Sequence, residues 1–159
     1  MYPVSLGFVE AERRIRELIK NGHHAEALIT SVFSFEKTLK RALRCCAIRR
    51  GFTSKQADTL FKNKGFNDLK EIWTCYSPDY RPLHEFIDPV KWQHVPPAVT
   101  MRNKLAHGER VYKLTDCEIS ANQVLDALID FRNKLLTEIK FDGWARVPTR
   151  RNPALQWLS

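Results

Sequence analysis

Three polar residues in the stretch Met101 to Gly108, MRNKLAHG, have side chains suited to phosphoryl chemistry. The imidazole of His107 can accept or donate a proton near neutral pH. The guanidinium of Arg102 can bind two phosphate oxygens through parallel hydrogen bonds. The amide of Asn103 can hold the imidazole in one tautomer or bind a phosphate oxygen. Together they could cleave RNA without a metal, by attack of a ribose 2′-hydroxyl on the adjacent phosphorus.

Helical spacing predicts that these side chains share one face. At about 100° per residue, Asn103 and His107 lie one turn apart and Arg102 flanks them. Met101 and Leu105 fall on the other side of the same helix and are expected to point to the core. The three polar side chains should therefore converge on a face that the core does not use.

A second Arg-Asn-Lys-Leu sequence occurs thirty residues later, in FRNKLLTE. Thr137 occupies the position that corresponds to His107, and a threonine hydroxyl exchanges no proton near neutral pH. We interpret Arg132 and Asn133 as the polar side of a helix.

A single histidine is one group short for this reaction, because one base must activate the 2′-hydroxyl and one acid must protonate the leaving 5′-oxygen. Two-fold symmetry would supply His107 and Arg102 twice in one groove. The chemistry therefore predicts a homodimer.

The heptad RNKLAHG (residues 102–108) resembles the Arg-polar-x-x-x-His signature of the HEPN superfamily, and a compatible helical pattern extends over about residues 8–140. The resemblance implies an all-α, metal-independent endoribonuclease of toxin–antitoxin or phage-defence type. It implies His107 as acid and base, Arg102 as phosphate and transition-state binder, and Asn103 as the orienting group, with no cofactor. It also implies a composite dimer site and an antitoxin or regulatory protein as partner.

Two further positions are compared with the family. The stretch VFSFEKTLKRAL resembles its second long helix, which makes Glu36 a secondary site candidate; alternatively, Glu36 is an exposed glutamate beside Lys37 and Lys40. Some family members carry a tyrosine two places after the histidine that a partner enzyme modifies. That position is Glu109 here, so silencing by adenylylation is not expected.

Apolar residues recur at helical spacing over most of the chain and predict an all-α antiparallel bundle over residues 1–143. Helices are expected over about 8–20, 23–49, 53–62, 67–76, 97–108 and 116–142, with proline-rich turns over 77–97 around a short helical piece at 83–87. The tail, residues 144–159, either packs on the bundle through Trp144, Leu155, Trp157 and Leu158 or stacks on bases.

The chain has 26 lysine and arginine residues against 18 acidic residues in 159, which gives a net charge of +8 and favours an anionic partner such as RNA. One basic cluster, a candidate contact surface or simply a solvated face, contains Arg41, Arg44, Arg49, Arg50, Lys55, Lys62 and Lys64. The four cysteines form no C-x-x-C pair, and the opening segment does not resemble a signal peptide, so we expect reduced thiols and a cytoplasmic, soluble protein without membrane contact.

Two other functions stay open at this point. A non-catalytic helical module could bind RNA or a protein through the basic face. A helix-turn-helix DNA binder would also suit the charge, although no pair of short helices with a tight glycine turn stands out. His23-His24, His84 and His94 have no carboxylate or thiol at ligand spacing, and no metal site is expected.

Overall fold

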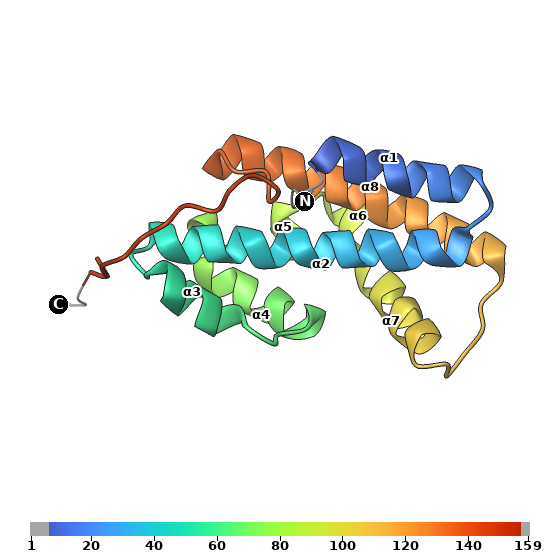
Figure 1. Ribbon diagram of the computed structural model, residues 1–159, viewed down its shortest axis with the longest axis horizontal. Helices are drawn as coiled ribbons and strands as arrows, with labels where there is room; N and C mark the ends of the chain where they lie inside the picture. The colour runs from blue at the N-terminus through green and yellow to red at the C-terminus, as the bar shows by residue number, and fades with distance from the viewer. Residues whose placement is uncertain (1–6, 157–159) are drawn as a thin grey trace, which may run out of the picture. The chain divides into compact units, whose positions relative to one another are not determined.

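The computed structural model describes residues 7–156, which form an all-α bundle with no strand among them, as the sequence predicts. The helices are α1 (Phe8–Lys20), α2 (His24–Arg49), α3 (Ser54–Phe61), α4 (Phe66–Tyr76), the 3-10 turn η1 (Pro78–Tyr80), α5 (Leu83–Phe86), α6 (Pro89–Trp92), α7 (Val95–Ala106) and α8 (Leu114–Ile139) (Figure 1). Within the described residues, no helix is both long and apolar enough to cross a membrane.

The chain divides into two compact units. Within the described range, unit 1 comprises residues 7–35 and Ile87–Phe131, and unit 2 comprises Glu36–Phe86 and residues 132–156. Residues of the two long helices, α2 and α8, contribute to both units.

Unit 1 is held together by aromatic and aliphatic side chains of α1, α2, α6, α7 and α8. Phe35 of α2 is fully buried, and its ring lies 5.4 Å from Phe131 and 6.1 Å from Trp92, measured between centroids. Such offset and tilted ring pairs add to the free energy gained by burying the rings. Ile15 of α1 and Leu128 of α8 are also fully buried. These side chains form the core of unit 1, to which the first turns of α7 contribute Val95, Ala98 and Val99.

Unit 2 has its own aromatic core. Trp73 of α4 is fully buried and meets Phe86 edge-on at 5.1 Å, and Phe61 of α3 meets Tyr76 at 5.4 Å. A capping box starts α3: the Thr53 side chain accepts from the backbone N–H of Gln56, whose side chain accepts from the backbone N–H of Thr53. Local sequence thus sets the start of α3, and the aromatic core holds it.

Arg41 and Arg49 of α2, with Arg50 directly after its end, hold the loops of unit 2 by hydrogen bonds. Arg41 donates to the carbonyl oxygens of Gly143 and Ala145, and Arg49 donates to that of Ile139. Arg50 donates to the carbonyl oxygens of Tyr76 and Ser77, at 3.0 and 2.6 Å, and to the Tyr80 hydroxyl. These members of the basic cluster therefore have structural contacts that the sequence did not predict.

The tail runs beside the start of α3. The backbone N–H of Ser54 donates to the carbonyl of Arg150, and the N–H of Arg150 donates to Ser54 Oγ, both at 2.9 Å. Ala154 N–H donates to Gly51 O at 2.8 Å, and a Cβ on Gly51 would lie 2.5 Å from Ala154 O.

The large apolar side chains of the tail, which were expected to pack on the bundle, differ in burial. Trp144 is half-buried with the Lys37 ammonium 4.7 Å from its ring centroid, whereas Leu155 is 45% exposed. Trp157 and Leu158 lie outside the described residues.

Candidate active site

Helix α7 carries the three candidate residues and belongs to unit 1. Pro96 and Pro97 lie in its first turn, where backbone N–H groups have no partner within the helix, so the prolines cost no hydrogen bond. Val95 and Val99 are buried, and Ser120 of α8 donates a hydrogen bond to the Met101 sulfur at 3.3 Å. The first two turns of α7 are therefore anchored, and the last turn carries the polar residues.

Glycine stops α7 directly after His107. Gly108 has φ +66°, a conformation that glycine adopts without strain. Its N–H donates to Leu105 O at 3.2 Å, and the N–H of Glu109 donates to Lys104 O at 2.9 Å. These two bonds form a Schellman motif. The glycine of the heptad thus has a structural role, which is to end the helix and leave the histidine at its last position.

Arg102 and Asn103 are in direct contact. Nε of Arg102 donates to Oδ1 of Asn103 at 2.8 Å. The arginine side chain is half-buried and the asparagine is exposed. With Oδ1 engaged in this way, the amide of Asn103 presents its two N–H donors, which suits an acceptor such as a phosphate oxygen.

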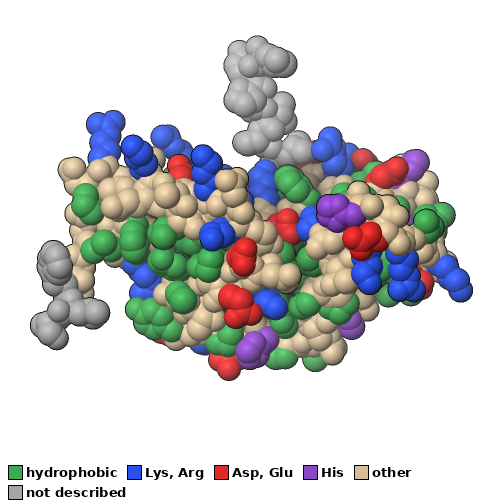
Figure 2. Space-filling view, turned by 90° about the horizontal axis from the view of Figure 1, so that it is seen from below, with side chains coloured by type: hydrophobic (Ala, Val, Ile, Leu, Met, Phe, Trp, Pro, Cys, Tyr) green, Lys and Arg blue, Asp and Glu red, His purple; other side chains and the backbone are tan. Residues whose placement is uncertain are grey.

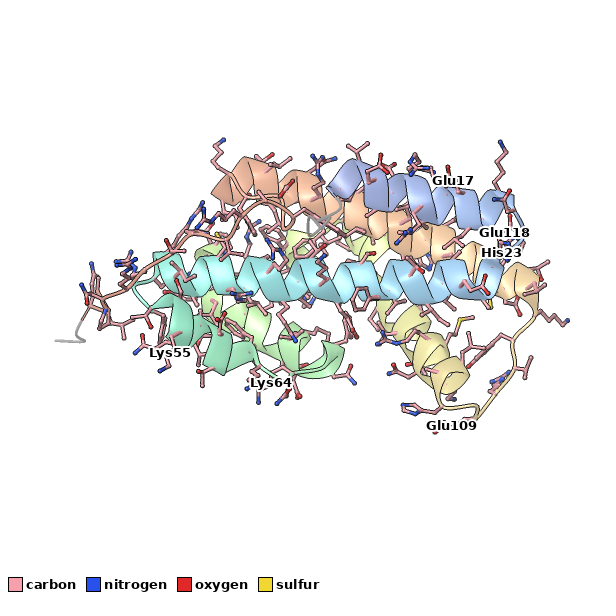
Figure 3. The ribbon with its side chains drawn as sticks, in the orientation of Figure 1. Glu17, His23, Lys55, Lys64, Glu109 and Glu118 are labelled. Atoms are coloured by element: carbon pink, nitrogen blue, oxygen red, sulfur yellow. The ribbon has the colours of Figure 1, made fainter. Side chains whose placement is uncertain are left out.

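His107 lies one turn beyond Asn103, at the C-cap of α7, with φ −92° and ψ 2°. Its N–H donates to Asn103 O at 3.0 Å, and its side chain is exposed. In Figure 3, Glu109 marks the turn at the far end of α7, and Figure 2 shows histidine side chains (purple) at the surface of the face in view. We call Arg102, Asn103 and His107 the α7 trio.

The other sequence candidates are placed elsewhere. Glu36 is a half-buried residue of α2 and belongs to unit 2, whereas the α7 trio belongs to unit 1. The second Arg-Asn-Lys-Leu sequence lies inside α8, where Asn133 and Lys134 are exposed and Nε of Arg132 lies 3.9 Å from Asp142 Oδ2.

One cation near the trio was not selected from the sequence. The guanidinium of Arg110 lies 4.8 Å from the ring centroid of Tyr112, in the segment between α7 and α8. Arg110 follows Gly108, where the helical pattern ends, so the sequence pattern could not predict where this side chain lies. Arg110 is an additional candidate for phosphate contact at this end of unit 1.

Two histidines of unit 1 outside the trio lie close to acidic side chains. His23 Nδ1 lies 3.2 Å from Glu26, and His24 Nε2 lies 3.7 Å from Glu118. Among residues 7–156, no group of three His, Cys, Asp or Glu side chains is arranged to hold a metal ion.

Comparisons with known proteins gave no relative. No family model matches the chain, and neither a curated protein nor a solved structure matches it.

Proposed function

We propose that this chain is a metal-independent endoribonuclease of HEPN type that acts as a homodimer, with the α7 trio as its catalytic residues. The observation that carries the proposal is the contact of Arg102 with Asn103 at 2.8 Å, one helical turn before an exposed His107. A guanidinium, an amide and an imidazole therefore lie within residues 102–107 at the end of α7, which supports the proposed roles.

The proposed reaction forms one bond and breaks one. His107 of one protomer takes the proton of a ribose 2′-hydroxyl, and O2′ attacks the adjacent phosphorus. Arg102 binds the non-bridging oxygens as negative charge builds on them. The bond from phosphorus to O5′ breaks, and the partner's His107 gives a proton to O5′. The products are a 2′,3′-cyclic phosphate and a 5′-hydroxyl.

The dimer and the regulatory partner are part of the proposal. A two-fold axis that brings the exposed ends of two α7 helices together would supply both proton-transfer groups. An endonuclease with this activity would need restraint, so we propose an antitoxin or regulatory protein as partner and RNA as substrate. Glu36 remains a secondary candidate.

Cleavage of total RNA in EDTA tests the proposal. We expect the wild type to cut, His107→Ala and Arg102→Ala to be inactive, and His84→Ala to match the wild type. His84 is the matched control because its side chain is 62% exposed and lies in α5 of unit 2. Equal activity in His107→Ala and His84→Ala would refute the site.

The second candidate function is a non-catalytic helical module that binds RNA. The observation that favours it is the concentration of basic residues in unit 2, which does not contain the trio. A binding module would show RNA affinity that His107→Ala leaves intact, and the folded wild type would cut no RNA under any ionic condition.

A further inference from the structure

The net positive charge of the protein belongs to one unit. Unit 2 contains 17 lysine and arginine residues against 8 aspartate and glutamate residues, a net charge of +9. Unit 1 contains 9 basic and 10 acidic residues, a net charge of −1. The unit that carries the α7 trio is therefore close to neutral, and the unit without it is strongly basic.

Much of the positive charge in unit 2 is not cancelled by its hydrogen-bond partners. Arg41, Arg49, Arg50 and Arg150 donate to backbone carbonyl oxygens, which carry no formal charge. Burial, followed by the nearby charge of Arg44, lowers the pKa of Arg41 below its usual value. The net charge of +9 in this unit favours association with polyanions.

Three exposed lysines lie in α3 and directly after it, and we call them the α3 lysines: Lys55, Lys62 and Lys64. Lys55 is in the first turn of α3 and Lys62 is its C-cap, seven residues later, a spacing of two helical turns or about 10 Å along the helix. That spacing is close to three nucleotides at about 3.4 Å each along a strand. The N–H of Lys64 donates to Phe61 O, which holds this lysine against the end of α3.

The acidic residue of α3, Asp58, forms an ion pair with an arginine of α2. Asp58 Oδ1 lies 2.5 Å from Nη2 of Arg44, so the carboxylate is paired with a cation of α2. Figure 3 shows Lys55 and Lys64 on the outer side of α3 and of the segment that follows it. At the start of α3, Arg150 accepts from the Ser54 N–H and donates to Ser54 Oγ, and exposed Arg151 follows it directly in sequence.

We infer that unit 2 is the RNA-binding part of the protein and that the α3 lysines contact the phosphate backbone of the substrate. The inference rests on the proposed function for the identity of the polyanion. Binding and cleavage are then assigned to different residues: the α3 lysines supply affinity independent of base sequence, and the α7 trio supplies the chemistry.

The test is the affinity for a fluorescein-labelled 2′-O-methyl uridine 20-mer, which 2′-hydroxyl attack cannot cleave, measured by anisotropy against KCl concentration. The triple variant Lys55→Gln, Lys62→Gln, Lys64→Gln is compared with a matched triple on unit 1, Arg14→Gln, Lys20→Gln, Lys91→Gln. All six residues are exposed, and each variant loses three charges.

We expect the α3 triple to bind about tenfold more weakly or worse near 0.1 M salt. We also expect the slope of log affinity against log salt to be shallower by about 2, since each phosphate contact contributes about 0.7. The unit 1 triple should stay within about twofold of the wild type. Equal losses in both triples, or no loss in the α3 triple, would overturn the inference. Competition by poly-L-glutamate as strong as that by RNA would also overturn it, because the surface would then suit an acidic protein.

Failure of this inference and failure of the proposed function look different. If the α3 triple binds poorly while the wild type cuts no RNA in EDTA, RNA binding by unit 2 stands and the ribonuclease proposal falls. If the wild type cuts RNA in a His107-dependent way and the α3 triple binds and cuts normally, the ribonuclease stands and this inference falls.

Discussion

Arg102 donates a hydrogen bond from Nε to Oδ1 of its neighbour Asn103 at 2.8 Å, on the last turn of a helix that ends one residue before His107. Adjacent residues on a helix point about 100° apart, so this contact requires the arginine side chain to turn toward the asparagine. The contact fixes which atoms of the amide face outward. It gives the account its most specific prediction.

Replacing Arg102 with lysine should lower the cleavage rate about 100-fold while the melting temperature stays near that of the wild type. Lysine keeps the charge but loses both the Nε contact with Asn103 and the planar fork that binds two phosphate oxygens. Single-turnover cleavage of a defined RNA measures the effect. A wild-type rate in Arg102→Lys would mean that charge alone suffices and that the contact has no part in catalysis.

Replacing Gly108 with alanine should lower the free energy of unfolding by about 1 kcal/mol, because an alanine at φ +66° is strained. No atom lies within 4 Å of the added Cβ, so steric overlap does not contribute. Gly108→Asn is the control, since asparagine tolerates this conformation and should cost less. If urea denaturation gives Gly108→Ala a free energy of unfolding equal to or above that of Gly108→Asn, the result would contradict the Schellman motif at the end of α7.

Replacing Arg50 with glutamine should lower the free energy of unfolding by about 2–3 kcal/mol, since the side chain donates to Tyr76 O, Ser77 O and the Tyr80 hydroxyl. Arg151→Gln, at an exposed position, should change stability by less than about 0.5 kcal/mol. Equal stabilities of the two variants would show that the arginine contacts of α2 do not hold the η1 segment.

Cysteine labelling should report burial in both units. Cys75 is exposed, whereas Cys45, Cys46 and Cys117 are buried and free. At pH 8 a disulfide reagent should react rapidly with one thiol per chain in the native protein, and Cys75→Ser should remove that phase. Rapid reaction of two or more thiols in the native wild type would contradict the burial.

The same thiols predict a pH effect on stability. Burial, with a smaller effect of Cys45, raises the pKa of Cys46 to about 12, although the nearby Arg50 and Arg49 act in the opposite direction. A group that holds its proton more tightly in the folded state stabilises the fold fully below its unfolded pKa, near 8.5, and loses that contribution as the pH rises toward 12. The free energy of unfolding should therefore fall over this window, and Cys46→Ala should fall less.

Sequence periodicity predicted the fold class and most helices well. The long run from 23 to 49 became α2 (His24–Arg49), and the expected helical piece within the proline-rich segment became α5 (Leu83–Phe86). The helix expected over about 67–76 became α4 (Phe66–Tyr76), with Gly65 as its N-cap. Ile119, an apolar residue of the last predicted helix, is 55% exposed, so periodicity did not identify every exposed position.

The sequence placed the α7 trio on one helical end, but it could not reveal contacts between distant residues. Arg41 and Gly143 are 102 positions apart, and no local pattern relates them. The basic cluster was therefore interpreted as a uniform surface, whereas four of its arginines contact carbonyl or carboxylate oxygens and its three lysines are exposed. The separation of charge between units required the structure, because each unit is made of two chain segments.

The most direct test of the central claim is the chemistry of the product ends after the purified wild type digests RNA in EDTA, determined by mass spectrometry. The account predicts 2′,3′-cyclic phosphates paired with 5′-hydroxyls, and neither in a digest with His107→Ala. Products with 3′-hydroxyls and 5′-phosphates, or intact RNA after incubation with the folded wild type, would contradict it.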